Sequence, residues 1–277
     1  MAASRIPRRL YTFWDNDPPE FISACIGLLD RTAGSEWDLT VLTAESAARE
    51  LSPPPAVALS PAQLSDWYRL SALSSSGGVY LDASCIALAP PDAWVDRGLD
   101  AVQGFAFHPD GETADSWAIA APAGCPLIKR WRDEFRAALI RGVAEYCAEK
   151  EAAGHSTAGL SASLPYLAVL LCFRVARAAH PERAVRLTSA TAPGCPLHHL
   201  RLADWDPLAA VSALFAASAE ELADTPLVKL RACDRECVPP LGAMGRGSWL
   251  ARQLRPELGS RVDWLLSGTK RAEHLSF

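Results

Sequence analysis

The residues with the clearest capacity for chemistry lie in one stretch, residues 64–86 (LSDWYRLSALSSSGGVYLDASCI). Asp66 and Arg69 are three positions apart in a run with helical spacing, which places them side by side on one helix face. Asp82 and Ser84 follow a short apolar run, and a carboxylate and a hydroxyl at this spacing can both face a divalent cation bound to diphosphate oxygens. Each feature alone is common in purely structural roles, such as a surface ion pair or a turn acid. Their occurrence together in this order indicates a binding site.

The elements that must position these residues alternate along the first part of the chain. Strand-like composition marks residues 9–14, 37–43 and 79–81, and helical spacing marks residues 18–29, 44–51 and 65–76. Gly77-Gly78 ends the third of these helices. This order predicts an α/β fold with a mostly parallel central sheet and helices on both faces. Trp14, Thr43 and Asp82 fall at the strand ends, and ligands of such sheets bind outside the carboxyl ends of the strands.

The remainder of the chain predicts a helical C-terminal elaboration of the same domain. Further strands are expected over residues 101–107, 116–121 and 226–231, and further helices over residues 126–151 and 163–180. No internal repeat, low-complexity linker or sharp change of composition interrupts the sequence. We therefore expect one domain over residues 1–277.

Charge and composition exclude several classes of protein. The formal net charge of the 277-residue chain is −5, which argues against a protein whose main function is to bind nucleic acid or an anionic membrane. The longest apolar run, residues 166–173, is far too short to span a bilayer, and the first residues lack the apolar core of a signal peptide. We expect a cytoplasmic protein without a transmembrane segment.

The positions of the eight cysteines do not indicate a disulfide framework. Cys25, Cys85, Cys125, Cys147 and Cys172 stand alone in apolar stretches, where reduced cysteine behaves as a small hydrophobic residue.

A second group of cysteines has a spacing that zinc sites use. Cys233 and Cys237 follow His198 and His199, but neither a second cysteine pair nor a histidine pair comes after them. Ordinary thiols are the favoured interpretation of this pair.

The stretch around Asp82 also resembles a known group of enzymes. The pattern S-D-x-x-R, then about seven residues, then G-G-x-Y-L-D-x-S is similar to the nucleotide-sugar site of GT-A glycosyltransferases with a DXD motif. The resemblance is to the DXD sugar-transferase and capsular polysaccharide synthesis families. Residues 6–26 (IPRRLYTFWDNDPPEFISACI) and 115–131 (DSWAIAAPAGCPLIKRW) are similar to segments of the capsular group. The resemblance covers roughly residues 6–135.

This resemblance implies a role for each matching residue. Trp14 would stack on the nucleotide base beside backbone contacts from Phe13, and Thr43 would lie near the base or ribose. The sugar and diphosphate would be held by Asp66 and Arg69, and the ribose and phosphate region by Tyr80 and Asp82. The implied donor-binding set is Phe13, Trp14, Thr43, Asp66, Arg69, Tyr80, Leu81, Asp82 and Ala83. Mn²⁺ or Mg²⁺ would be held by Asp82 and Ser84.

The motif departs from the family pattern at one position. Its second aspartate is replaced by Ser84, so the chain reads Asp82-Ala83-Ser84. A neutral hydroxyl is a weaker ligand than a carboxylate for either metal. The metal is therefore expected to bind more weakly or to be dispensable.

The implied activity is transfer of a sugar from a nucleoside-diphosphate sugar, expected to be a UDP-sugar, to a glycan acceptor. Residues 1–135 would bind the donor and residues 136–277 the acceptor. Arg69 and the metal would neutralise charge on the departing diphosphate. The residues leave open whether the sugar's configuration is retained or inverted. An inverting enzyme would need a base near the acceptor hydroxyl, for which Asp115 is the candidate, with Glu112 behind it. The motif GRGSWL, residues 245–250, is a candidate element for closing over the donor.

Other functions remain open at this point. A nucleotidyltransferase uses a similar sheet but normally carries a glycine-rich phosphate loop near the first strand, and residues 12–20 (TFWDNDPPE) have none. A dinucleotide oxidoreductase is disfavoured because no G-x-G-x-x-G follows that strand. A degenerate transferase that binds nucleotide-sugars as a scaffold is the non-enzymatic alternative.

Overall fold

The protein has a mixed α/β architecture, seen in a computed structural model that describes residues 6–108, 110–160, 164–240 and 248–255. The strands are β1 (Arg9–Phe13), β2 (Asp38–Leu42), β3 (Gly78–Leu81), β4 (Cys85–Ala87), β5 (Ala101–Ala106), β6 (Ala118–Ala121), β7 (Ala184–Ser189) and β8 (Leu227–Lys229). Six of them form one sheet in the order β2-β1-β3-β6-β5-β7, and β4 pairs with β8 in a second sheet. Only β6 runs against the other strands of the large sheet. The expected α/β class with a mostly parallel sheet is confirmed.

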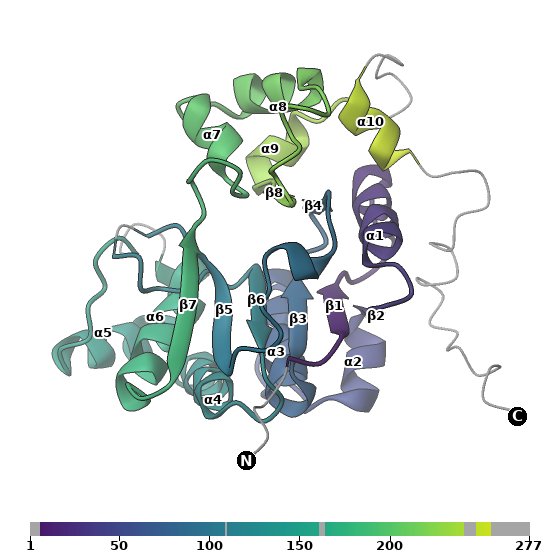
Figure 1. The fold of residues 1–277 in the computed structure, drawn as a ribbon. Coiled ribbons are helices and arrows are strands. Elements are labelled where there is room, and N and C mark those ends of the chain that lie inside the picture. The colour runs from purple at the N-terminus through teal and green to yellow at the C-terminus, as the bar shows by residue number, and fades with distance from the viewer. Residues whose placement is uncertain (1–5, 109, 161–163, 241–247, 256–277) are drawn as a thin grey trace, which may run out of the picture.

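The helices fill the segments between these strands and form most of the C-terminal part (Figure 1). They are α1 (Glu20–Ala33), α2 (Ala44–Glu50), α3 (Pro61–Ser76), the 3-10 helix η1 (Pro91–Ala93), α4 (Pro126–Arg141), α5 (Val143–Ala152), α6 (Leu164–Ala179), α7 (His198–Leu202), α8 (Pro207–Ala216), α9 (Ala232–Glu236) and α10 (Trp249–Leu254). Among the described residues, no helix combines the length and the apolar character needed to cross a bilayer.

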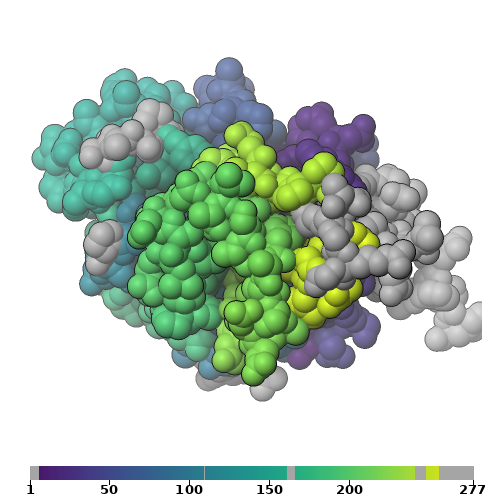
Figure 2. Space-filling view, turned by 90° about the horizontal axis from the view of Figure 1, so that it is seen from above, coloured from purple at the N-terminus to yellow at the C-terminus, as the bar shows by residue number. Residues whose placement is uncertain are grey.

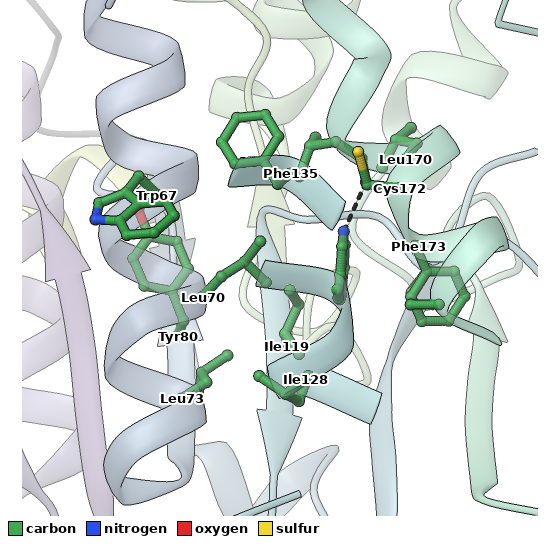
Figure 3. Close-up of a cluster of buried hydrophobic side chains, with 14 of the residues drawn as sticks. Trp67, Leu70, Leu73, Tyr80, Ile119, Ile128, Phe135, Leu170, Cys172 and Phe173 are labelled. Atoms are coloured by element: carbon green, nitrogen blue, oxygen red, sulfur yellow. Dashed lines mark hydrogen bonds between the residues drawn. The ribbon is translucent and has the colours of Figure 1, made fainter. Parts of the chain in front are cut away.

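Successive side chains of a strand point to opposite faces of a sheet, and in the strands β3, β6 and β5 of the large sheet both faces are buried. Tyr80 and Ile119 join the core under α3, α4 and α6, which Figure 3 shows. Their neighbours Val79 and Ala118 join a second core with α1, α7 and α8. The sequence expectation of helices on both faces is therefore confirmed.

The carboxyl ends of the parallel strands meet at one edge of the sheet. The strands β1, β2 and β3 end at Phe13, Leu42 and Leu81, so the residues expected to bind a ligand come directly after them. Since β6 is antiparallel to β3, its first residue pairs with Leu81 and its preceding loop reaches the same edge. The C-terminal elements α7 to α10, together with β4 and β8, lie over this edge (Figures 1 and 2).

The structure differs from the sequence expectation in the later part of the chain. The helix expected over residues 126–151 is two helices, because Gly142 between α4 and α5 has a φ of 96°, which a helix does not allow. The strands β4 and β7 were not expected, since β4 has three residues and β7 is largely exposed. The strand expected over residues 226–231 is present as β8.

Gly77, which links α3 to β3, allows a test of the backbone conformation that aligns the site. Gly77 has φ 61° and ψ −171°, and a Cβ there would lie 2.4 Å from the backbone nitrogen of Ala123. Gly34 ends α1 with φ 61° and ψ −156°, and a Cβ there would have no neighbouring atom within 4 Å. We expect Gly34→Ala to cost about 1–3 kcal/mol from backbone strain alone. Gly77→Ala should cost clearly more, because the clash adds to the same strain. Urea denaturation of both variants measures the difference, and equal losses would contradict the close packing at Gly77.

Candidate active site

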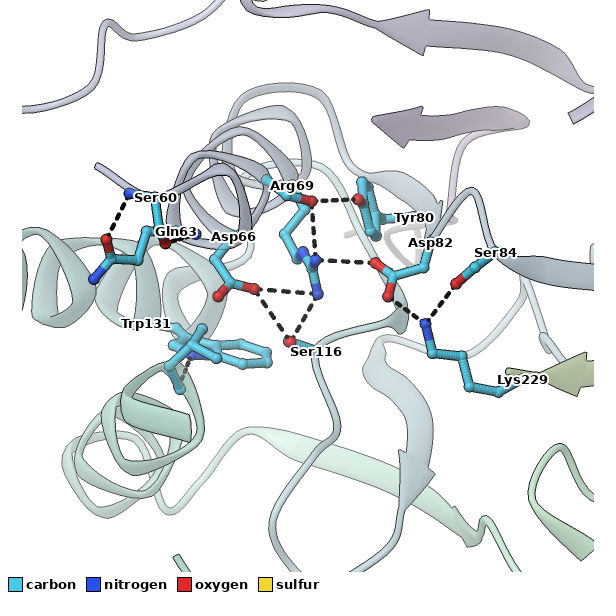
Figure 4. Close-up of polar contacts among 12 residues, drawn as sticks. Ser60, Gln63, Asp66, Arg69, Tyr80, Asp82, Ser84, Ser116, Trp131 and Lys229 are labelled. Carbon is cyan, nitrogen blue, oxygen red and sulfur yellow. Dashed lines mark hydrogen bonds and ion pairs between the residues drawn. The ribbon is translucent and has the colours of Figure 1, made fainter. Parts of the chain in front are cut away.

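Four charged side chains form one connected cluster at the carboxyl edge of the sheet (Figure 4). The guanidinium of Arg69 on α3 lies 3.2 Å from an oxygen of Asp66 and 2.9 Å from Oδ1 of Asp82. The other oxygen of Asp82, Oδ2, accepts a hydrogen bond of 2.5 Å from the Nζ atom of Lys229 on β8. The cluster therefore joins a helix, the turn after β3 and a strand far along the chain.

Arg69 is held from several sides. Its Nη1 atom donates to the Ser116 hydroxyl at 2.7 Å and its Nη2 atom to the Ser65 hydroxyl at 3.1 Å. Its guanidinium lies 4.6 Å from the centre of the Tyr80 ring, and the Tyr80 hydroxyl is 3.0 Å from that of Ser65. Tyr80 has no exposed surface. The Tyr80 side chain supports Arg69 from inside the core, and its expected contact with a ribose remains a prediction that this burial does not favour.

The Asp66–Arg69 pair is buried, so the alternative interpretation of these residues as a surface ion pair is wrong. Both residues are buried, with 8% and 5% of their surface exposed. Burial raises the pKa of the Asp66 carboxyl to about 6 although Arg69 and the Ser116 hydroxyl oppose the shift. Removing one member of a buried pair leaves the other charge without compensation, which costs far more than breaking a surface pair.

Asp82 and Lys229 are an ion pair. Burial alone would raise the pKa of Asp82, but the charges of Lys229 and Arg69 hold that pKa below its ordinary value. Burial alone would lower the pKa of Lys229, and the adjacent Asp82 carboxylate raises it instead. Both side chains are therefore charged at neutral pH.

The two residues expected to hold a divalent metal are both occupied by protein donors. Lys229 donates to Ser84 Oγ at 3.0 Å as well as to Asp82, and Arg69 takes the remaining Asp82 oxygen. Within the described ranges, no group of three or more His, Cys, Asp or Glu side chains is placed to hold a metal ion. The ammonium group of Lys229 lies between Asp82 and Ser84, so a metal cation cannot occupy the same place. The expectation of Mn²⁺ or Mg²⁺ at this site remains a prediction that these side chains do not favour.

The residues expected at the nucleotide base lie at the ends of the two neighbouring strands. Trp14 is half-buried, and its amide donates to Leu42 O at 3.0 Å, which keeps the ends of β1 and β2 together. Phe13 is buried and stacks on the Tyr68 ring at 5.7 Å. The hydroxyl of Thr43 accepts from the Ser46 amide and caps α2. Of these, Trp14 alone offers a partly exposed ring.

Leu81 and Ala83, which flank Asp82, are buried. Ala83 packs in a small apolar cluster with Ile22, Ile26 and Val41. Their side chains therefore hold the turn in place, and any contact they make with a donor would come from their backbone.

Asp115 reaches the site because β6 starts at the carboxyl edge. Its amide donates to Phe105 O at 2.9 Å, and its carboxyl group is buried with no hydrogen-bond partner for Oδ2 among the described residues. Burial raises the pKa of Asp115 to about 7, against the opposing influence of Trp117 and Lys229. Glu112 is exposed, in a turn where its amide donates to Asp110. A buried carboxyl with such a pKa can accept a proton near neutral pH.

The cysteine and histidine residues considered for zinc do not converge. Cys233 is exposed, while the carboxylate of its neighbour Asp234 is bound by Arg231. The His198 ring lies 3.2 Å from Thr191 O, and burial lowers the pKa of His199 to about 4. The five cysteines expected in the core are all buried.

The C-terminal motif is only partly visible. Residues 245–247 of the GRGSWL motif lie outside the described residues. Ser248 caps α10, and its hydroxyl donates to Phe215 O at 2.6 Å.

Lys229 and Ser116 were missed by sequence reasoning. Ser116 stands directly before a strand and carries no motif. Lys229 does leave a signal, because it is a lysine inside the apolar run LVKL of an expected strand. A lysine buried in a strand needs a counter-charge nearby, and Asp82 was the acid available for that role.

The ion pair between the buried Lys229 and the half-buried Asp82 predicts strong coupling between the two residues. Asp82→Asn leaves Lys229 and Arg69 without their shared counter-charge, and we expect it to lower the free energy of unfolding by about 3 kcal/mol. The double variant Asp82→Asn/Lys229→Met should recover part of that loss, because no lone charge stays buried at β8. Denaturant unfolding of the single and double variants gives the coupling energy. Additive losses would show that the two residues do not interact.

The raised pKa of Asp115 predicts how stability depends on pH. Its folded pKa of about 7 exceeds the ordinary value of 3.8, so the folded state keeps a proton that the unfolded state releases. The contribution of Asp115 is fully present below about pH 4 and is lost as the pH rises to about 7. The melting temperature of the native chain minus that of Asp115→Asn should therefore fall over this range. A constant difference would mean that Asp115 titrates normally.

Comparison with known proteins finds similarity among solved structures alone: no protein-family model and no curated protein matches the chain. The chain is similar to the PaToxG glycosyltransferase, at 14% identity over 80% of this chain and 84% of that one, with a TM-score of 0.41. The apo-form glycosyltransferase GlyE of Streptococcus pneumoniae TIGR4 is 10% identical over 95% of this chain, with a TM-score of 0.47, and this chain spans 62% of GlyE. The galactosyltransferase LgtC, solved with donor and acceptor sugar analogues, is 12% identical over 96% of this chain and 98% of its own, with a TM-score of 0.38. All three TM-scores lie below 0.5, so these similarities carry no argument about the activity of this chain.

Proposed function

We propose that this chain is a glycosyltransferase of the GT-A type, which moves a sugar from a nucleoside-diphosphate sugar to a glycan acceptor. The observation that carries the proposal is the cluster of Asp66, Arg69, Asp82 and Lys229 at the carboxyl edge of a mostly parallel sheet, in which all but the half-buried Asp82 are buried. Ligands of such sheets bind at that edge, and buried cations there suit a diphosphate. The half-buried ring of Trp14 at a neighbouring strand end supplies a surface for a nucleotide base, for which uracil is our first candidate.

In the proposed reaction, the bond between the anomeric carbon of the sugar and the diphosphate oxygen breaks. The bonding electron pair remains on the diphosphate, which leaves as the nucleoside diphosphate. Lys229 has three N–H donors and two protein acceptors, so one donor remains for this oxygen-rich leaving group. Arg69 is turned toward protein acceptors and acts by positioning Asp82 and through its charge. Fixed positive charge of this kind stabilises the departing anion.

The acceptor hydroxyl forms the new bond to the anomeric carbon and loses its proton. Asp115 is the proposed base for that proton, because its carboxyl is close enough to feel the charge of Lys229 and its Oδ2 is free of described partners. A pKa of about 7 suits a base that must accept a proton near neutral pH. Residues 136–277, which also supply Lys229 to the diphosphate, are proposed to receive the glycan acceptor.

The test is a calorimetric and hydrolytic screen of UDP-, GDP- and TDP-sugars, with and without Mn²⁺. We expect one nucleotide class to bind and its sugar to be released slowly to water. Trp14→Ala should weaken the binding of that nucleotide by about 1–3 kcal/mol, the range for a base stacked on an aromatic ring. Trp14→Phe is the matched control, since it keeps an aromatic face and should lose less.

The possible outcomes separate this function from its alternatives. Binding without any turnover, in the presence of candidate glycan acceptors, would favour a nucleotide-sugar-binding scaffold. Release of pyrophosphate from a nucleoside triphosphate would favour a nucleotidyltransferase. If no nucleotide-sugar binds under either metal condition while the protein remains folded, the proposed function is wrong.

A further inference from the structure

The place expected to hold a divalent metal contains a protein ammonium group. The Nζ atom of Lys229 lies 2.5 Å from Asp82 Oδ2 and 3.0 Å from Ser84 Oγ, which are the two groups expected to ligate the metal. Asp82 Oδ1 accepts from Arg69 at 2.9 Å. Ser84 donates its own proton toward Leu230 O at 3.4 Å. Figure 4 shows Lys229 reaching both residues of the motif from the opposite strand.

In this arrangement both groups expected to ligate the metal already accept hydrogen bonds from protein cations. Mg²⁺ takes oxygen ligands at about 2.0–2.1 Å in octahedral geometry. An ammonium group has three donors and no acceptor, so it cannot ligate a metal and repels one at hydrogen-bond distance. Lys229 is buried and is paired to Cys85 across the β4–β8 sheet, so the backbone fixes it next to the Asp82 turn.

A second positively charged side chain, that of Arg235, lies on the next element of the chain, α9. Arg235 belongs to α9, which begins three residues after β8, and its side chain is half-buried. Arg235 lies close enough to Asp82 and Lys229 for its charge to lower the pKa of both side chains slightly. Among the residues that the structure describes, its guanidinium forms no hydrogen bond or ion pair. Two of the site's positive charges, on Lys229 and Arg235, thus come from one short stretch of chain.

The charges of this stretch match those of the expected metal. Lys229 and Arg235 together carry two positive charges, as one divalent cation would, beside the single carboxylate of Asp82. Arg69 contacts Asp66 at 3.2 Å as well as Asp82 at 2.9 Å, and these three side chains together carry one net negative charge. The local net charge that faces a diphosphate is therefore the same with these two side chains as with a metal bound to Asp82.

We propose that Lys229 and Arg235 replace the divalent metal, so that this site binds the diphosphate of a nucleotide-sugar without Mn²⁺ or Mg²⁺. The inference rests on the proposed function, because it assumes that a nucleoside diphosphate is the ligand. It also explains why a serine is accepted at position 84: a hydroxyl can accept from Lys229 without adding a second negative charge.

The direct test uses the unmodified protein and calorimetric titration with UDP, GDP and TDP, in EDTA and in Mn²⁺. We expect one nucleotide to bind with the same affinity in both buffers. Binding that requires Mn²⁺, or that strengthens about tenfold or more with it, would overturn the inference and leave the proposed function standing. Absence of binding in both buffers would overturn the proposed function, and the inference with it.

Two substitutions test the residues themselves. Arg235→Gln removes a charge without breaking any ion pair among the described residues, and we expect it to weaken nucleotide binding in EDTA about tenfold. Arg136→Gln, the same change at an exposed arginine on α4, is the matched control and should have no effect. Lys229→Met should weaken binding at least as much. Unchanged affinity in both folded site variants would overturn the inference.

A third comparison asks whether the metal site can be restored. Ser84→Asp alone should not create Mn²⁺-dependent binding, because the new carboxylate would pair with Lys229. The double variant Ser84→Asp/Lys229→Ala removes the ammonium group and supplies two carboxylates, and nucleotide binding by it should become dependent on Mn²⁺. Tight Mn²⁺-dependent binding by Ser84→Asp with Lys229 in place would contradict the proposed replacement.

Discussion

The site depends on one interaction, the sharing of the Asp82 carboxylate between Arg69 and Lys229. Each oxygen of Asp82 accepts from one cation, at 2.9 Å from Arg69 and 2.5 Å from Lys229. Charges in the interior of a protein are tolerated when each is paired with an opposite charge. Asp82 therefore connects the helix α3 to the C-terminal strand β8.

The backbone topology makes this sharing possible. The antiparallel strand β6 begins at the edge where the parallel strands end, so Ser116 can hold both Arg69 and Asp66. The same loop delivers Asp115 into a buried position, where water cannot stabilise its charge. The tight link at Gly77, against the backbone of Ala123, keeps α3 in line with β3. The charged cluster and the buried Asp115 thus lie at the same edge of the sheet, although they come from different elements of the chain.

Sequence patterns could predict the local half of this site. Helical spacing placed Asp66 beside Arg69, and strand ends placed Trp14 and Asp82 at a common edge, because both features depend on neighbours in the chain. Lys229 could not be paired with Asp82 in the same way, since 147 positions separate them and the sheet that joins them has three-residue strands. The sequence also could not show that the Asp66–Arg69 pair is buried. Nothing in the neighbouring residues distinguishes a surface pair from one enclosed by Tyr80 and Ser116.

In the proposed site, protein cations and not a metal compensate Asp82 and meet the diphosphate. The sharpest test is a crystal structure of the unmodified protein grown with a nucleoside diphosphate and Mn²⁺, with anomalous diffraction data. We expect diphosphate oxygens in contact with Lys229 and Arg235, and no manganese peak at Asp82. A manganese peak between Asp82 and the diphosphate, with Lys229 turned away from Asp82, would contradict it.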